Sequence, residues 1–386
     1  MLKIPPKIEY ILSSLQENGH KAYIVGGCVR DMLLGKTPND YDITTSAFPD
    51  EVIDIFPKTV PTGIKHGTVT VISDGEPVEV TTFREEYGYS DNRRPDSVSF
   101  VGNLEKDLMR RDFTVNAMAY NYSDGLKDYY GGKEDLNNGI LRAVGNPEER
   151  FREDALRILR LFRFSAQLEF EIEEETLFSA INLQKGLENI SRERIFSELY
   201  KACCAKNPQA IKPLIQNGGL EFLGLSELPD FDLMKKYSYD RDLCFYILIS
   251  GNENFFDILN ELKVSNKIKK LCETLLLLKN SEESFDKVGI KEMLSISGEE
   301  ILRKHIKITL KDETQILKAE KIISEITENT EPYLISHLSI GGKQLKKMGF
   351  SGEEVGKCLE LMRKYVILNP EKNDLSSLKN FIENQK

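Results

Sequence analysis

Two acidic residues separated by one position, Asp40 and Asp42, are the first whose types and spacing suggest chemistry. They follow a glycine pair, Gly26–Gly27, and Arg30. In an extended segment, side chains at i and i+2 project from the same face, so both carboxylates would point to one place. Such groups repel each other unless a cation lies between them, and Mg²⁺ takes oxygen ligands together with phosphate oxygens. The pair therefore predicts a magnesium site that acts on phosphates.

Three neighbouring features would complete this site. The pair Gly26–Gly27 lets the backbone approach a ligand closely, and amides that turn into a helix there would form an anion site within reach of Arg30, with Gly27 as a nucleotide-binding residue. Glu79 lies in the alternating run PVEVTTF and could stand on an adjacent strand as a third carboxylate. Two metals bridged in this way would activate a hydroxyl and stabilise a leaving pyrophosphate. Each feature alone is more often a turn, a loop or an exposed position, and their order favours the functional interpretation.

A second group of residues suits a triphosphate. Arg110 and Arg111 are adjacent in RRDFTVNA, and a planar guanidinium matches phosphate oxygens in pairs. We expect a helix over Asp107–Tyr120. On that helix, Asp112 and Asn116 would lie one turn apart and face one ligand.

A third group suits the edge of a base. The segment ERFREDALRILRLFRFSAQ has apolar residues at helical spacing, and its polar residues would form a ridge on one helix. The ridge consists of Asp154, Arg157, Arg160 and Arg163. A carboxylate and a guanidinium match the amino donor and ring-nitrogen acceptor of cytosine and adenine. Guanine and uracil present the opposite order and would leave buried polar groups unpaired. The alternative is an ordinary Glu153–Arg157 helix pair worth about 0.2–0.5 kcal/mol.

Together the three groups resemble the motifs of the class II tRNA nucleotidyltransferases, the CCA-adding enzymes, and of their bacterial poly(A) polymerase relatives. The segment from Val25 to Thr45 resembles the first motif, and the other two groups resemble the family's RRDFTxNA and EDxxR motifs. The resemblance covers the first half of the chain with high specificity and the remainder loosely. It implies that the RRDFTVNA residues handle sugar and triphosphate, and that Asp154 and Arg157 select CTP and ATP. Glu153 would orient Asp154 and Arg157. Arg160 and Arg163 would contact phosphates or support the two base-selecting residues.

Positioning these groups requires a sheet followed by helices. Strands are expected over Ala22–Gly27, Gly67–Ile72 and Val78–Phe83, whereas the chain after Pro147 is rich in Leu, Ile, Lys and Glu with few strand signals. The predicted class is α+β, and the resemblance implies a mixed-sheet, polymerase-β-like head followed by an all-α neck, body and tail. The predicted boundaries are 1–138 for the head, 139–200 for the neck with the nucleotide-selecting helix, 201–310 for the body and 311–386 for a tRNA-binding tail.

Composition excludes several classes of protein. The 386 residues are 40% hydrophobic and 30% charged. They contain no apolar run of about 18 residues, so no membrane span is expected. The polar N-terminus does not suit a signal peptide, and a cytoplasmic location is expected. A net charge of −10 argues against an indiscriminate nucleic-acid binder. The six cysteines and four histidines are irregularly spaced, which argues against structural zinc.

The expected function is template-independent addition of C, C and A to the tRNA 3′ end from CTP and ATP, with release of pyrophosphate. Residues Arg84–Phe100 suggest a ligand-contacting loop, which the family requires for terminal A addition. Tail cations around Lys343–Lys347, with Lys357, Arg363 and Lys364, are candidates for RNA phosphate contacts. Addition of A alone, poly(A) synthesis and a catalytically inactive RNA-binding protein remain alternatives, although the intact aspartate pair argues against the last. The oligomeric state is left open.

Overall fold

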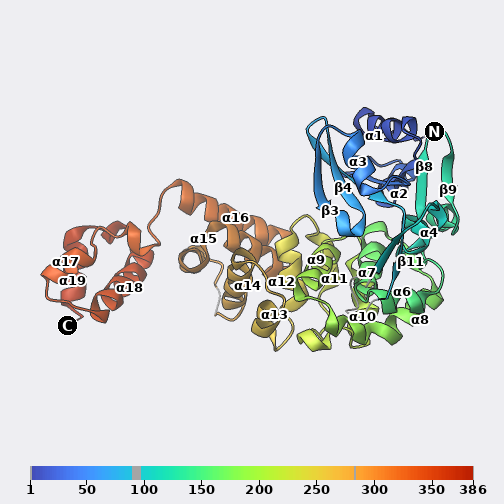
Figure 1. Cartoon of the computed structure of the whole chain (residues 1–386). Helices are drawn as coiled ribbons and strands as arrows, with labels where there is room; N and C mark the ends of the chain where they lie inside the picture. Colours follow the sequence, from blue (N-terminus) through green and yellow to red (C-terminus); the bar gives the residue numbers. More distant parts are fainter. Residues whose placement is uncertain (1, 89–96, 282–283, 386) are drawn as a thin grey trace. The chain divides into compact units, whose positions relative to one another are not determined.

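The computed structural model describes residues 2–88, 97–281 and 284–385, and the chain forms two compact units, Met1–Lys263 and Val264–Lys386 (Figure 1). All strands of the described residues lie in the first unit. The predicted α+β class, with a mixed-sheet head followed by helices, is confirmed.

A seven-stranded mixed sheet, in the order β3-β4-β5-β2-β1-β8-β9, forms the centre of the head. Its strands are β1 (Ala22–Val25), β2 (Asp42–Thr45), β3 (Thr59–Gly63), β4 (Thr68–Ser73), β5 (Glu76–Thr82), β8 (Met118–Asn121) and β9 (Gly125–Asp128). β2 and β5 run parallel, whereas the other neighbours are antiparallel. A parallel pair needs a long connection, and α3 (Pro49–Ile55), β3 and β4 supply it. This crossover brings the strand that begins at Asp42 beside the strand that carries Glu79.

Helices pack on the sheet because its central strands are apolar on both faces. All four residues of β1 are buried. α1 (Pro6–Glu17) contacts β1 and β4 through one apolar stripe. Leu104 and Leu108 of α4 (Leu104–Met109) share a core with Tyr23 and Val25 of β1. α2 (Gly27–Leu33) follows β1 directly, so the glycine pair lies at the junction of strand and helix.

The segment Asp107–Tyr120 is not the single helix that the sequence predicts. α4 ends early, a 3-10 turn covers Thr114–Asn116, and β8 begins at Met118. The cause is tertiary pairing, because Ala119 pairs with Val25 and all of β8 is buried. Pairing of this kind overrides the weak helical preference of a short segment.

The loop predicted over Arg84–Phe100 is partly a hairpin. β6 (Arg84–Tyr87) pairs antiparallel with β7 (Ser97–Phe100). Residues 89–96, at the centre of the predicted loop, lie outside the described residues. The role assigned to this loop therefore stays a prediction.

The rest of the first unit is helical, apart from a short parallel pair, β10 (Ile140–Leu141) with β11 (Glu171–Ile172). Its helices are α5 (Gly132–Asn138), α6 (Pro147–Glu153), α7 (Leu156–Leu168), α8 (Glu174–Leu183), α9 (Arg192–Ala202), α10 (Lys212–Gln216), α11 (Phe231–Lys236), α12 (Arg241–Ile249) and α13 (Phe255–Glu261). α7 packs against α9. This packing matters because α7 carries three of the predicted nucleotide-binding arginines.

Asp154 separates two helices where the sequence predicts one. α6 ends at Glu153, α7 begins at Leu156, and Asp154 between them has an extended backbone with φ −141° and ψ 102°. Its Oδ1 accepts a hydrogen bond from the Leu156 N–H at 3.0 Å, in the manner of an N-capping carboxylate. Asp154 therefore does not belong to a helical ridge with the arginines of α7, and that part of the prediction is wrong.

The second unit has two separate apolar cores. The first joins α14 (Asn266–Lys279), α15 (Lys287–Thr309) and α16 (Glu313–Glu328). α15 is kinked at Gly298, whose φ of 71° is readily adopted by glycine. The second core joins α17 (Gly342–Lys347), α18 (Glu353–Leu368) and α19 (Leu375–Glu383). Gly349 and Gly352, both at positive φ, lie in the connection between α17 and α18.

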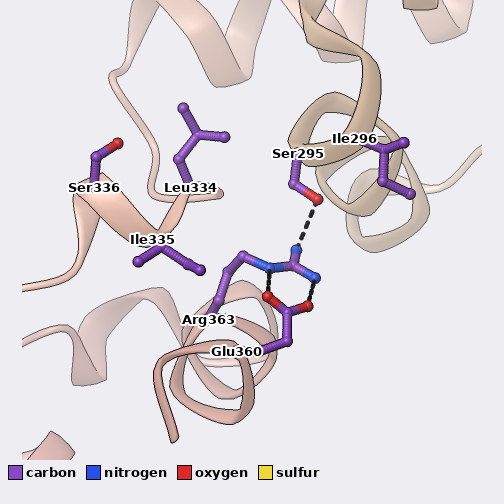
Figure 2. Close-up of a pocket in the computed structure, with 7 residues that line it drawn as sticks. All are labelled: Ser295, Ile296, Leu334, Ile335, Ser336, Glu360 and Arg363. Atoms are coloured by element: carbon purple, nitrogen blue, oxygen red, sulfur yellow. Dashed lines mark hydrogen bonds and ion pairs between the residues drawn. The ribbon is translucent and has the colours of Figure 1, made fainter. Parts of the chain in front are cut away.

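Arg363 of α18 differs from the other tail cations that the sequence suggests for RNA contact. It is only 9% exposed and lines a small pocket (Figure 2). Its guanidinium binds Glu360 through two nitrogens and donates to Ser295 Oγ of α15 at 2.9 Å. Arg363 thus joins the tail to α15, whereas Lys346 and Lys347 are exposed.

Two further expectations concern the chain as a whole. In the described parts of the chain, no helix is long and apolar enough to cross a membrane. The predicted division into head, neck, body and tail is finer than the two compact units. Those four boundaries stay predictions.

Candidate active site

The carboxylates of the site meet where β2 and β5 run side by side. Asp42 is the first residue of β2 and pairs in register with Val25 of β1 and Glu79 of β5. Asp40 precedes the strand, so the two aspartates are not both strand residues as the sequence predicts. Asp40, Asp42 and Glu79 are all exposed to solvent. The register nevertheless places Glu79 beside Asp42, in agreement with the expected position of a third carboxylate.

Asp42 is an electrostatically strained carboxylate. The surrounding protein partly desolvates it, which raises its pKa, and the negative charges of Glu79 and Asp40 raise the pKa further. Arg111 acts in the opposite direction, but the net pKa of Asp42 stays above its ordinary value. A bound cation would relieve this strain.

The donor set at Asp42 fits magnesium in its chemistry. It consists of carboxylate oxygens, which hard cations prefer. Within the described residues, no three acidic, histidine or cysteine side chains are arranged closely enough to hold a metal by themselves. Such a cage is not required, because Mg²⁺ is commonly held by one or two carboxylates together with substrate phosphates and water.

The glycine pair brings the backbone close to Arg111. Gly26 has φ 81° and ψ −132°, a conformation that side chains other than glycine rarely adopt. A Cβ atom at Gly26 would lie 3.0 Å from Arg111 Nη1, whereas one at Gly27 would make an ordinary 3.5 Å contact with Arg30 Nη2. Of the predicted pair, Gly26 is therefore the position where the geometry requires glycine.

Arg111 interacts electrostatically with Asp42, and one of its nitrogens has no hydrogen-bond partner among the described residues. It lies 3.7 Å from Asp107 through Nη2 and also interacts electrostatically with Asp42. Its Nε is buried, and the described residues offer it no hydrogen-bond partner. Arg110 binds Asp107 instead, through Nε at 3.1 Å and Nη2 at 2.9 Å. Of the two adjacent arginines, Arg111 is thus the one with a buried nitrogen that the described residues leave without a partner.

A buried polar network runs from α2 to α7. Arg30 donates to Asn116 Oδ1 at 2.6 Å, and Asn116 donates to Asp112 Oδ1 at 3.1 Å. Arg160 donates to Asp112 Oδ2 through Nε at 2.8 Å and Nη2 at 2.5 Å. Burial raises the pKa of Asp112, but Arg160, Asn116 and Arg157 together outweigh this effect, and the net pKa is lowered. The network joins four predicted nucleotide-binding residues, although Asp112 and Asn116 do not share a helix.

The arginines of α7 diverge to different partners. Arg157 donates to Glu153 Oε2 at 2.6 Å, to the Arg110 carbonyl at 2.8 Å and to the Arg150 carbonyl at 3.2 Å. The pairing of Glu153 with Arg157 is thus present, as both the functional and the ordinary interpretation expect. Arg163 turns away from Asp112 toward Glu198 and Gln167, and its guanidinium lies 3.9 Å from the centre of the Phe164 ring.

Sequence reasoning missed two residues of α9. Arg194 Nη2 donates to Asp154 Oδ2 at 2.9 Å, and Glu198 binds Arg163. In the sequence, Arg194 and Glu198 stand four positions apart, which is the spacing of an ordinary helix ion pair. No pattern in the sequence connects them to α7.

Two family models match the chain. The poly A polymerase head domain matches residues 22–142, and the probable RNA and SrmB-binding site of polymerase A matches residues 169–228. The first match contains the carboxylates and the segment from Arg111 to Asn116. Asp154 and Arg157 lie between the two matches.

Similar proteins extend along nearly the whole chain. The CCA-adding enzyme of Lactobacillus helveticus is 36% identical over 97% of this chain and 95% of its own, and that of Streptococcus gordonii is 37% identical over 97% and 96%. A crystal structure of the Bacillus stearothermophilus CCA-adding enzyme in complex with CTP matches with a TM-score of 0.83 and 29% identity, covering 99% of both chains. The Thermotoga maritima CCA-adding enzyme complexed with tRNA shares the fold at 22% identity and a TM-score of 0.68.

Proposed function

The chain belongs to the CCA-adding enzymes, and on this premise we propose that it adds C, C and A to the 3′ end of tRNA without a nucleic-acid template. The nucleotides come from CTP and ATP, and pyrophosphate is released. The chain is an enzyme, a tRNA nucleotidyltransferase.

One observation carries the proposal: Asp42, at the start of β2, pairs in register with Glu79 and interacts electrostatically with Arg111. Carboxylates that hold a cation and a guanidinium that holds phosphate are the two requirements of nucleotidyl transfer, and here they adjoin. The network from Arg30 to Arg160 then connects this place to α7, beside the residues assigned to the base.

We assign Asp40 and Asp42 as magnesium ligands, with Glu79 as a third carboxylate of the site. Nucleotidyltransferases of this family generally use a divalent metal. When bound, magnesium supplies charge neutralisation at the triphosphate and activation of the attacking hydroxyl. The exposure of all three carboxylates leaves them open to a cation and to substrate oxygens.

Arg111, Arg30 and the Gly26–Gly27 turn hold the triphosphate in this proposal. Arg111 is suited to this role because its buried Nε has no acceptor among the described residues. Arg30 is held in place by Asp31 at 2.8 Å and by Asn116. The tRNA 3′ hydroxyl then attacks the α-phosphorus, and the bond to the leaving pyrophosphate breaks.

Asp154 and Arg157 select the base. Asp154 accepts a hydrogen bond from the exocyclic amino group of cytosine or adenine, and Arg157 donates to the adjacent ring nitrogen. Glu153 keeps the Arg157 guanidinium in one orientation. Arg160 and Arg163 support the site, Arg160 through Asp112 and Arg163 through Glu198.

The helical region beyond the head is assigned to tRNA. The match at residues 169–228 to an RNA-binding model supports this assignment. Recognition of an RNA helix by shape and backbone contacts requires only local cations, so it is compatible with a net charge of −10. We place this activity in the cytoplasm, where tRNA is the substrate.

The deciding experiment supplies labelled CTP and ATP, separately and together, to tRNAs that end before the tail, after C and after CC. Addition of C, C and A that then stops is the expected result. Addition of A to the CC-ended tRNA alone would indicate an A-adding enzyme, and long A tails would indicate a poly(A) polymerase. Tight tRNA binding without any incorporation would reveal an inactive RNA-binding protein.

The metal assignment has its own test. Removal of divalent cations by a chelator is expected to stop incorporation, and Mg²⁺ added in excess is expected to restore it. Incorporation that persists in the chelator would contradict the assigned role of Asp40 and Asp42.

A further inference from the structure

Asp154 belongs to neither α6 nor α7 and makes few contacts that fix its side chain locally. It occupies the extended residue between α6 and α7, and only Oδ1 is fixed locally, by the Leu156 N–H. A carboxylate that must accept a hydrogen bond from one particular base edge needs a fixed direction as well as a fixed position. The remaining oxygen, Oδ2, therefore decides how Asp154 faces a base.

Arg194 holds that second oxygen from a different helix. Its Nη2 lies 2.9 Å from Asp154 Oδ2, a charge-assisted contact between residues 40 positions apart in the chain. α9, which carries Arg194, is held against α7 by the Arg163–Glu198 ion pair and by the buried residues Ile195 and Leu199. Arg194 is thus presented from a packed helix.

Arg194 also has a donor that the described residues leave unused. Its Nη1 is buried, and the part of the chain that the structure describes provides no acceptor for it. A buried donor without an acceptor is unfavourable. A role that only stabilised the joint between α6 and α7 would not explain such a donor. Nη1 belongs to the same guanidinium that binds Asp154. If a bound base shifts the Asp154 carboxylate, Nη1 can therefore donate to the carboxylate in its new position.

We propose that Arg194 is a positioning residue for base selection, which acts by orienting the Asp154 carboxylate toward the amino group of the incoming base. This inference rests on the proposed function and on the role assigned to Asp154. Arg194 itself does not contact the reacting atoms. Its loss frees the carboxylate to turn, and a turned carboxylate no longer rejects a carbonyl at the same place on uracil or guanine.

The test compares CTP with UTP on tRNA that ends before the tail, and ATP with GTP on tRNA that ends in CC. In Arg194→Ala, each ratio of kcat/KM values is expected to fall by about tenfold or more. Arg194→Lys keeps a positive charge opposite Asp154 and is expected to restore part of the discrimination. Arg194→Gln, which keeps most of the side-chain length without the charge, serves the same comparison if the alanine variant unfolds.

Arg192 of the same helix provides a matched control. Its side chain is 26% exposed, as is that of Arg194, and it pairs with Glu261 at 3.3 Å and lies over Phe222. Arg192→Ala removes an arginine ion pair of α9 away from Asp154, so the CTP to UTP ratio is expected to stay at its wild-type value. A double mutant with Asp154→Asn is expected to lose little more discrimination than Asp154→Asn alone, because the two residues act as a unit.

Two outcomes would overturn the inference, and a third is separate. If Arg194→Ala and Arg194→Gln keep wild-type ratios while activity toward all nucleotides falls equally, Arg194 is only structural. If the Arg192 variant loses discrimination equally, the effect belongs to α9 as a whole. If the wild-type chain itself adds neither C nor A to tRNA, the proposed function fails, whatever the variants show.

Discussion

The proposed phosphate end and the proposed base end of the site are built in opposite ways. At the phosphate end, Asp42 has a raised pKa beside two other carboxylates, and Arg111 has a buried nitrogen without an acceptor among the described residues. At the base end, Arg157 already donates to one carboxylate and two carbonyls. The first end is completed by a cation and a substrate, whereas the second is organised before substrate arrives. Removal of a charge should therefore have different consequences at the two ends.

The largest expected effect is at the phosphate end. Asp42→Ala should reduce nucleotide transfer by about 10³-fold or more, because a metal ligand contributes several kcal/mol of transition-state stabilisation. The affinity for tRNA, measured by filter binding, should stay close to wild type because Asp42 has no assigned role in RNA binding. An equal loss of transfer and of tRNA affinity would mean that Asp42 is structural.

Arg157→Ala should produce the next largest effect, at the base end. Discrimination of CTP and ATP from UTP and GTP should fall by about ten- to a hundredfold, since the variant removes a polar partner worth about 1–3 kcal/mol. Thermal unfolding should occur at a lower temperature, because two buried carbonyls lose their donor. Retained discrimination would contradict the assignment of Arg157 to the base.

Removal of a charge at the phosphate end should raise the thermal stability of the protein, whereas Arg157→Ala should lower it. Because the pKa of Asp42 is raised in the folded chain, its ionised form opposes folding above that pKa. Asp42→Asn should therefore raise the Tm at pH 7 in the absence of divalent cations. The difference should shrink as pH falls and the wild-type carboxylate becomes protonated. It should also shrink when Mg²⁺ is added, because Mg²⁺ stabilises the wild type alone.

The smallest predicted effect compares two glycines with nearly the same φ. Gly26→Ala and Gly75→Ala both place a side chain at positive φ, 81° and 80°, which is unfavourable for residues other than glycine. A Cβ at Gly26 also meets Arg111, whereas within the described residues nothing lies within 4 Å of one at Gly75. Only Gly26→Ala should raise the KM for nucleotide. A similar rise in the KM for nucleotide in Gly75→Ala would show that the effect does not come from contact with Arg111.

The sequence was sufficient where local spacing and strand alternation carry the information. The position of Glu79 on a strand beside Asp42 could be predicted because alternation indicates which runs form strands, and the mixed-sheet head could be predicted from the resemblance to the family. The end of α4 and the start of β8 could not, since β8 exists only through its pairing with β1. The break at Asp154 was hidden for a related reason: its residues suit a continuous helix, and the position of Arg194 comes from another part of the chain.

The parallel pairing of β2 with β5 has a consequence for how the enzyme becomes active during folding. Parallel strands cannot be joined by a tight turn, so Asp42 and Glu79 meet only when the long connection that contains α3, β3 and β4 closes between them. Non-local pairings of this kind form slowly, because the chain entropy of closing the loop is lost before the contacts repay it. The affinity for metal should consequently appear late in refolding, when the sheet of the head is complete. A nascent chain that ends before β5 would contain both aspartates and still lack the site.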